Sequence, residues 1–338
     1  MQVSIVEMIG LALTTWLTIF FVRSWDPLSS RFMDHPVARS IHRDPVPRLG
    51  GIVMVAVLLS FMFLFHHDFI VQHSWLVGAV VMVFGVGVLD DRIALIARHK
   101  LLAIVLASVL LVMDGVVVEH IGTFFRMDIT LGWLAVPFTV FAVSGLTNAI
   151  NLIDGLDGLA ASLGLAMLVV FAWIGYHHHD PFMFTVSLYL IVGLAVFLMF
   201  NWFPASIFLG DAGSLMIGFV IAILAIKSLA YYSAVSVLFM VLIPVIDTAV
   251  VMLRRWRTGR SIFAPDRCHT HHIVKAFFKG SSPRTALILG TLQLIYGLTG
   301  LYLNPHADEG IPLLLILLNI ALVYLFSNAM IRWEKREC

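Results

Sequence analysis

The hydrophobic and polar positions of this chain fall into long blocks. Apolar stretches run almost unbroken for roughly 15–20 residues, and short polar segments separate them. A helix needs about 20 apolar residues to cross about 30 Å of hydrocarbon, so we expect each stretch to form a transmembrane helix. The pattern predicts eleven spans, at 3–22, 49–65, 75–89, 101–113, 131–147, 159–176, 182–200, 213–230, 234–252, 285–303 and 311–331.

The distribution of basic residues predicts how these spans are oriented. With the N-terminus outside, 19 of the 21 Lys and Arg residues fall in cytoplasmic segments, and the two exceptions are Arg126 and Lys227. This asymmetry follows the positive-inside rule and places the C-terminus in the cytoplasm. Residues 1–22 have no basic leader and no small-residue cleavage site, so we expect a first span there and not a removable signal peptide.

The composition agrees with a helical membrane protein of one domain. Of the 338 residues, 60% are hydrophobic and 12% are charged, whereas a soluble domain has about 25% charged residues. This excludes an ordinary soluble enzyme, a disordered tail and a nucleic-acid binder. The unbroken apolar stretches exclude a membrane β-barrel, whose strands alternate apolar and polar residues. No linker or internal repeat divides the chain, so we expect a single membrane-embedded domain over residues 1–338.

The acidic residues gather at one side of the predicted membrane. Six of them lie at or near the cytoplasmic ends of spans, where they face a loop rich in Arg and His. Carboxylates together with an Asn side chain can hold Mg²⁺, and Arg and His can bind phosphate oxygens. The pattern therefore favours transfer from a cytoplasmic nucleotide-type diphosphate to a membrane lipid. The six acids are Asp90, Asp91, Asp154, Asp157, Asp211 and Asp247.

Each acidic motif also has a purely structural interpretation. Asp90 and Asp91 would cap the third span and pair with Arg92. The residues 154–158 would form a turn, and Asp211 would lie at the N-terminus of the eighth span. Asp247 would be a structural partner for an Arg or Asn in the bundle.

The run Pro265–His272 combines Asp266, Arg267, Cys268 and three histidines. Structural zinc sites usually use four spaced ligands, and this run is too compressed for them. Contact of its Arg and His side chains with phosphate or sugar is the favoured interpretation.

Taken together, these motifs resemble the polyprenyl-phosphate N-acetylhexosamine-1-phosphate transferase family. The resemblance extends from end to end, and the PDRxHxHH run and the residues 47–51 are similar to its WecA-type branch. The motifs are DHPVARSIHRDPVPRLGG at 34–51, LDDR at 89–92, TNAINLIDGLDGLA at 147–160, FLGDAGS at 208–214, IPVIDTAVVMLRR at 243–255 and PDRCHTHH at 265–272.

The resemblance implies a role for each motif. It assigns Mg²⁺, with Mn²⁺ as an alternative ion, to Asn151 and Asp211. It makes Asp90 a base or an orienter of the lipid phosphate, within a catalytic set of Asp90, Asp91, Asp154 and Asp157. It implies nucleotide or sugar contacts from Asn201, Phe208, Arg267, His269, His271 and His272, with contact to the base from Asp157 as well. Supporting residues would be His42, Asp247 and Arg254.

The implied reaction converts UDP-GlcNAc and undecaprenyl phosphate into undecaprenyl-diphospho-GlcNAc and UMP, in a bacterial inner membrane and as the first membrane step of a surface polysaccharide. UDP-GalNAc or UDP-MurNAc-pentapeptide remain alternative donors within the family. A membrane transporter and a non-catalytic scaffold are alternatives from other classes. A transporter would place its acids near the bilayer midplane. Small residues in the spans would allow packing into a homodimer.

Overall fold

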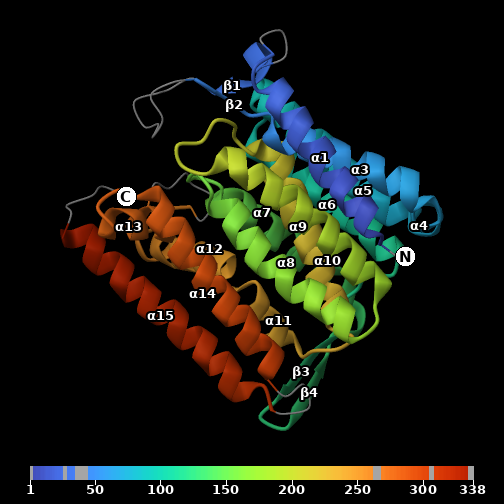
Figure 1. The fold of residues 1–338 in the computed structure, drawn as a ribbon. Helices are drawn as coiled ribbons and strands as arrows, with labels where there is room; N and C mark the ends of the chain where they lie inside the picture. Colours follow the sequence, from blue (N-terminus) through green and yellow to red (C-terminus); the bar gives the residue numbers. More distant parts are fainter. Residues whose placement is uncertain (1–2, 26–28, 35–44, 262–267, 304–307, 334–338) are drawn as a thin grey trace.

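The computed structural model describes residues 3–25, 29–34, 45–261, 268–303 and 308–333. In these ranges the chain is predominantly helical (Figure 1). The longer helices are α1 (Ile5–Val22), α3 (Gly50–Phe65), α5 (Ser74–Ile93), α6 (Ala97–Met113), α7 (Ala135–Ile153), α8 (Leu159–His177), α9 (Pro181–Asn201), α10 (Gly210–Ser228), α12 (Leu242–Arg257), α14 (Ser282–Tyr302) and α15 (Gly310–Trp333). Shorter elements are α4 (His67–Gln72), α11 (Ala234–Met240), α13 (Thr270–Phe277) and the 3-10 turns η1 (Ser30–Phe32) and η2 (Gly132–Leu134).

The fold is that of a multi-pass membrane protein. Seven of the described helices are long and apolar enough to cross a membrane, and an eighth span results if one bent pair is counted as a single span. Each of the eleven predicted ranges contains helix, but α3 has 16 residues and α6 has 17. The number of eleven spans and the side on which each end lies therefore stay predictions.

The ninth predicted span, 234–252, is not one continuous helix. Its two halves, α11 and α12, meet at 90° around Val241. Pro244 lies in the first turn of α12, where its missing N–H is tolerated. The buried Gln293 of α14 stabilises the break, since its Oε1 accepts from Ile243 N at 2.9 Å and its Nε2 donates to Met240 O at 2.8 Å. The apolar pattern runs through the break, which is why the sequence predicted a straight span.

The centre of the bundle is α10, which packs against α3, α5, α7 and α8. Small residues bring the backbones close together at the start of α10. A Cβ atom on Gly51 would lie 2.4 Å from Gly213 Cα, and one on Gly87 would lie 2.4 Å from Ala212 Cα. These contacts fix the ends of α3 and α5 next to the first turn of α10. By contrast, α15 lies at the edge of the bundle and packs against α11, α12 and α13.

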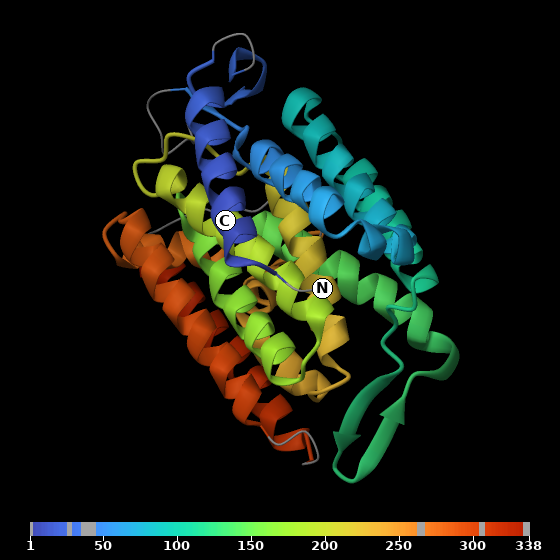
Figure 2. The same cartoon turned by 45° about the vertical axis from the view of Figure 1, so that its right-hand side comes forward.

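Two short antiparallel ribbons lie at opposite ends of the bundle (Figure 1). The strands β1 (Met33–Asp34) and β2 (Val46–Pro47) pair beside the start of α3. The strands β3 (His120–Phe124) and β4 (Met127–Thr130) form a hairpin that projects beyond the helices (Figure 2). The polar side chains described next lie at the end of the bundle that carries β1 and β2.

Candidate active site

A polar cavity of about 390 Å³ opens between the ends of α7, α9 and α10 and the ribbon β1–β2. Ligand pockets typically have volumes of ~300–1,000 Å³, so this cavity could hold much of a small polar ligand. Most of the acids and amides that the sequence singled out contribute to its wall. The lining residues include Asp34, Arg48, Asn151, Asp154, Gly155, Asp157, Asn201, Phe208, Asp211 and His272.

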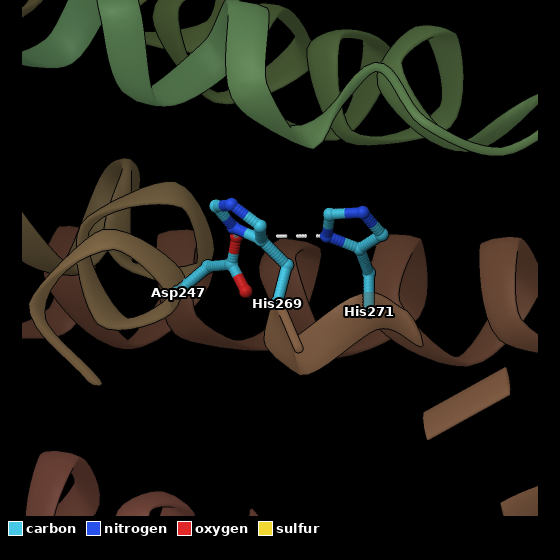
Figure 3. Close-up of side chains that lie close together, drawn as sticks. All are labelled: Asp247, His269 and His271. Carbon is cyan, nitrogen blue, oxygen red and sulfur yellow. Dashed lines mark hydrogen bonds and ion pairs between the residues drawn. The ribbon is translucent and has the colours of Figure 1, made fainter. Parts of the chain in front are cut away.

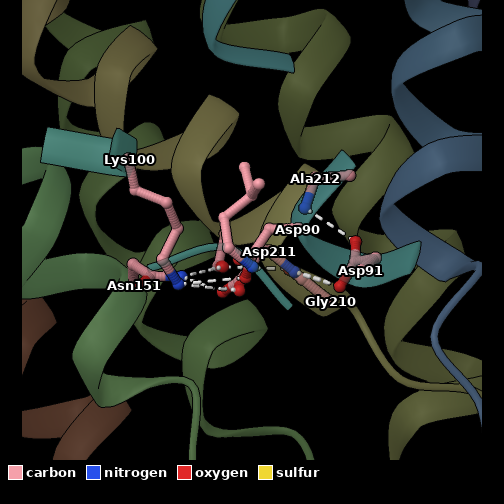
Figure 4. A network of polar contacts seen from close by, with 9 residues as sticks. Asp90, Asp91, Lys100, Asn151, Gly210, Asp211 and Ala212 are labelled. Carbon is pink, nitrogen blue, oxygen red and sulfur yellow. Dashed lines mark hydrogen bonds and ion pairs between the residues drawn. The ribbon is translucent and has the colours of Figure 1, made fainter. Parts of the chain in front are cut away.

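Asn151 and Asp211, to which the family resemblance assigned Mg²⁺, are in contact at the wall of this cavity. Asn151 lies in the last turn of α7, and its Nδ2 donates to Asp211 Oδ1 in the first turn of α10. The same amide nitrogen donates to Ser214 Oγ at 2.8 Å. Both hydrogen bonds therefore use Nδ2, and neither uses the amide oxygen of Asn151. Figure 4 shows the Asn151 amide against the Asp211 carboxylate. An amide oxygen and a carboxylate are hard ligands of the kind that divalent cations prefer.

A lysine that the sequence analysis did not select holds two of the acids together. Lys100 Nζ lies 3.0 Å from Asp90 Oδ2 and 3.1 Å from Asp211 Oδ2 (Figure 4). The other oxygen of Asp90 accepts from Leu95 N at 2.6 Å. Both oxygens of Asp90 are thus engaged, and its carboxylate is buried. The bridging ammonium shows that a cation is stabilised between these two carboxylates.

Asp91 points away from Asp90 and caps α10. Its two oxygens accept from the backbone N–H groups of Asp211 at 2.8 Å and Ala212 at 2.9 Å. Free N–H groups and the helix dipole make the first turn of a helix a favourable place for a carboxylate. Gly210 has φ +70°, and a Cβ atom there would lie 2.6 Å from Asp91 Oδ2, so only glycine fits between cap and helix.

The loop between α7 and α8 carries Asp154 and Asp157 into the cavity. Burial, assisted by the negative charges of Asp91 and Asp157, raises the pKa of the Asp154 carboxyl to about 7, against the opposing effect of Arg48. Asp157 Oδ2 accepts from Ala205 N at 3.1 Å, which ties this loop to the segment between α9 and α10.

Asn201 makes a second tie between the same two segments. Its Oδ1 accepts from Gly158 N at 2.9 Å, and its Nδ2 donates to Ile207 O at 2.9 Å. The buried Asn201 therefore supports the wall of the cavity through backbone groups, and the half-buried Phe208 lies on the same wall.

Among the described residues that line the cavity, Arg48 supplies a positive charge. Its Nη2 lies 2.7 Å from Asp34 Oδ1, across the ribbon β1–β2. The sequence motif at 34–51 contains both residues, but their pairing depends on the ribbon. The motif's His42 and the run's Arg267 lie outside the described residues, so their predicted roles stay predictions.

The histidine run divides between two places. His272 lines the cavity, whereas His269 and His271 are buried against Asp247 of α12 (Figure 3). His269 Nδ1 lies 2.8 Å from Asp247 Oδ2, and Thr270 N donates to Asp247 Oδ1 at 2.5 Å. Arg254 Nη1 donates to Cys268 O at 2.7 Å. Asp247 and Arg254 thus hold the start of α13 on α12.

His272 is uncharged at neutral pH. Its pKa is lowered to about 3, mainly by burial and also by the neighbouring His271 and His269. Asp247 has the opposite, smaller effect. A Cβ atom on Gly155 would lie 3.0 Å from His271 Nε2 and 3.4 Å from His272 Cε1. The histidine run therefore packs directly on the loop that carries Asp154 and Asp157.

Comparison with known proteins connects this arrangement to one family. The family model described as glycosyl transferase family 4 matches residues 73–229. A Bacillus subtilis (strain 168) protein named "Probable undecaprenyl-phosphate N-acetylglucosaminyl 1-phosphate transferase" is 33% identical over 279 residues, which cover 80% of this chain and 77% of that protein. The chain belongs to glycosyl transferase family 4.

Two further relatives are similar over most of the chain. A Salmonella typhi protein named undecaprenyl-phosphate alpha-N-acetylglucosaminyl 1-phosphate transferase is 31% identical, over 92% of this chain and 88% of its own length. A Mycolicibacterium smegmatis protein named decaprenyl-phosphate N-acetylglucosaminephosphotransferase is 30% identical, over 84% of this chain and 78% of its own length. The resemblance drawn from the sequence motifs is confirmed.

The family-4 match spans the acids and amides of the cavity except Asp34, and it stops before α12. It includes Asp90, Lys100, Asn151 and Asp211, and it leaves out Asp247 and the histidine run. Lys100 is the last basic residue of the segment that follows Asp91 and precedes the fourth predicted span. That position is the signal by which the sequence could have indicated it.

Proposed function

We propose that this protein transfers GlcNAc-1-phosphate from UDP-GlcNAc to undecaprenyl phosphate in a bacterial inner membrane. The observation that carries the proposal is the convergence of Asn151, Asp154 and Asp211 on one polar cavity at an end of a membrane bundle. The names of the relatives contain the same acceptor lipid and the same transferred group, N-acetylglucosaminyl 1-phosphate. We treat residues 1–338 as one transferase domain whose cavity faces the cytoplasm. The predicted homodimer is left as a prediction.

The residues around Asp211 fit a divalent cation. Asn151 and Asp211 offer an amide oxygen and a carboxylate, and the ammonium of Lys100 already occupies a cation position beside Asp211. We propose that Asn151 and Asp211 hold Mg²⁺, or Mn²⁺ in its place, with Asp154 on the same wall. Bound there, the ion would neutralise charge on the diphosphate during transfer.

The lipid phosphate needs little help to become a nucleophile. A phosphate monoester has its second pKa at about 6, so it is mostly a dianion at neutral pH. We propose that its oxygen attacks the β-phosphorus, forming the new P–O bond as the bond to UMP breaks. Both carboxylate oxygens of Asp90 are engaged, by Leu95 N and Lys100 Nζ. We therefore propose that Asp90 positions the lipid phosphate and does not attack the donor phosphorus itself.

The other cavity residues suit recognition of the donor. Arg48 is a cation that can bind a diphosphate oxygen. The neutral His272 can exchange hydrogen bonds with sugar or amide groups of the donor. The half-buried Phe208 offers an aromatic face near Asp157 and Asn201, where a nucleotide base could stack. We propose that Asn201 acts by holding this wall in place.

The decisive experiment measures UMP release by the purified protein with undecaprenyl phosphate and Mg²⁺. UDP-GlcNAc, UDP-GalNAc and UDP-MurNAc-pentapeptide are compared side by side, with Asp211→Asn as the inactive control. We expect release with UDP-GlcNAc that is lost in the control and after removal of Mg²⁺ with a chelator. UMP release with only one of the other two donors would support the same reaction with a different sugar substrate. No release from folded protein with any donor would refute the proposal.

A further inference from the structure

Three buried side chains meet at the histidine run, and none of them is among the residues that line the polar cavity. Asp247, His269 and His271 each offer a ligand atom, and these atoms lie within 4.8 Å of one another (Figure 3). Their side chains are 2%, 7% and 1% exposed. The run alone was too compressed for a metal site, but Asp247 comes from α12 and supplies a ligand that the run lacks.

His271 is the unexplained member of this group. Neither of its ring nitrogens has a hydrogen-bond partner among the described residues. Its Nδ1 lies 3.5 Å from Asp247 Oδ2, which is longer than an N–H···O bond of about 2.9 Å. A neutral imidazole carries one N–H donor and one acceptor, and burying both unpaired is costly. A ligand between His271 and Asp247 would remove that cost.

The spacing and chemistry of the group suit a transition-metal ion. Zinc binds nitrogen and carboxylate oxygen at about 2.0–2.2 Å, which in a tetrahedral site separates the ligand atoms by roughly 3.3 Å. The distances from Asp247 Oδ2 to His269 Nδ1 and His271 Nδ1, 2.8 and 3.5 Å, bracket that value. Two imidazoles and one carboxylate favour zinc over magnesium, which prefers oxygen ligands. Thr270 N would act as a supporting donor to the ligating carboxylate.

We propose that Asp247, His269 and His271 bind one zinc-type cation, at a site distinct from the one formed by Asn151 and Asp211. The ion fastens the start of α13 to α12. It thereby holds His272 against Gly155 in the cavity wall. The site is structural, and its occupancy is independent of the sugar donor.

Zinc content tests the proposal directly. Full-length protein without a polyhistidine tag is loaded with zinc in the presence of Mg²⁺, passed through gel filtration, and measured by mass spectrometry of the metal. We expect about one zinc ion per chain in the wild type. His271→Gln and Asp247→Asn should lose at least about four-fifths of it, because a three-ligand protein site does not survive loss of one ligand. The matched control is His99→Gln, an exposed histidine at the start of α6, which should keep it.

Cobalt substitution gives a measurement that does not depend on a variant. Co²⁺ in the wild type should give the intense visible absorption of tetrahedral cobalt, and added zinc should abolish it. The melting temperature of the wild type and of His99→Gln should rise with zinc. A wild type that retains no zinc and gives no tetrahedral cobalt spectrum would overturn the proposal, as would folded His271→Gln that retains zinc as the wild type does. These measurements use no substrate, so their results test the zinc site independently of the UMP-release experiment.

Discussion

The carboxylate of Asp91 accepts a hydrogen bond of 2.8 Å from the backbone N–H of Asp211. One acid of the Asp90–Asp91 pair therefore positions the helix that carries another acid of the site. The two members of the pair have different tasks, because adjacent residues of a helix point in different directions. Asp90 pairs with Lys100, and Asp91 caps α10.

The capping role predicts that Asp91→Ala is a stability variant as well as an inactive one. Loss of a helix cap costs about 0.5–2 kcal/mol, and the displaced first turn would carry Asp211 with it. We expect a lower melting temperature in detergent together with loss of UMP release. If Asp91 were only a proton acceptor, activity would fall while the melting temperature stayed at the wild-type value.

Replacement of Lys100 should expose the repulsion between the two carboxylates that it bridges. In Lys100→Met, Asp90 and Asp211 lose their shared ammonium, so we expect lower stability without metal and a larger stabilisation by added Mg²⁺. Turnover should fall by roughly tenfold or more, which corresponds to about 1.4 kcal/mol. Melting curves and UMP release at several Mg²⁺ concentrations check this. Arg98→Met, which removes a neighbouring exposed cation, is the control.

The Asp154 carboxyl should make metal-free protein less stable as the pH rises. Its pKa in the folded protein is about 7, above the ordinary value of 3.8, so the folded state holds the proton more tightly than the unfolded state. The resulting stability is fully present below about pH 4 and is lost as the pH rises through 7. Asp154→Asn should remove this part of the dependence. Melting temperatures from pH 5 to 8, measured for both proteins in chelator, test the difference, and parallel curves would contradict it.

His272 should contribute a pH dependence of the opposite sign. Its folded-state pKa is about 3, below the ordinary 6.5, so the folded protein excludes a proton that the unfolded chain accepts. Stability is therefore present above pH 6.5 and is lost as the pH falls towards 3. We compare the stability of His272→Gln with that of the wild type at two pH values. The variant should gain stability relative to the wild type when the pH is lowered from 7.5 to 5. An unchanged difference between the two pH values would show that His272 does not titrate in this way.

Gln293 should be essential for the break between α11 and α12. Gln293→Leu keeps the approximate volume but leaves Ile243 N and Met240 O without this partner. Leaving buried polar groups unsatisfied costs about 1–3 kcal/mol each, so the melting temperature should fall clearly. Gln293→Glu is the comparison, because it keeps an acceptor for Ile243 N. A Leu variant as stable as the wild type would mean that the bend is held by packing alone.

The sequence predicted the positions of the helices because uninterrupted apolar length is a local property. The resemblance of the motifs implied that Asn151 and Asp211 hold one Mg²⁺ ion, which stays a prediction, and the structure brings these two residues into contact. The break at Val241 was missed, because its partner Gln293 lies on another helix. The short ribbon that pairs Arg48 with Asp34 was missed for a different reason, because strands of two residues are too short to show an alternating pattern.

The division of labour among the selected residues could not be predicted from spacing. Asp90 and Asp91 are neighbours in the chain, yet one pairs with Lys100 and the other with a helix end. His269, His271 and His272 belong to one run, yet only His272 of the three lies on the cavity wall. Such differences depend on which element packs on which side, and this information is not contained in a local pattern.

The right angle between α11 and α12 also has a consequence for the surrounding lipid. The seven residues of α11 rise about 10 Å, roughly a third of the hydrocarbon thickness. We therefore expect the depth at which α12 turns aside to depend on how far α11 extends into the bilayer. A thicker bilayer would have to thin locally, or pull on α12, whose Asp247 contacts the histidine run. We expect the acyl-chain length of the membrane to act on this enzyme as a mechanical variable, separate from the supply of its substrates.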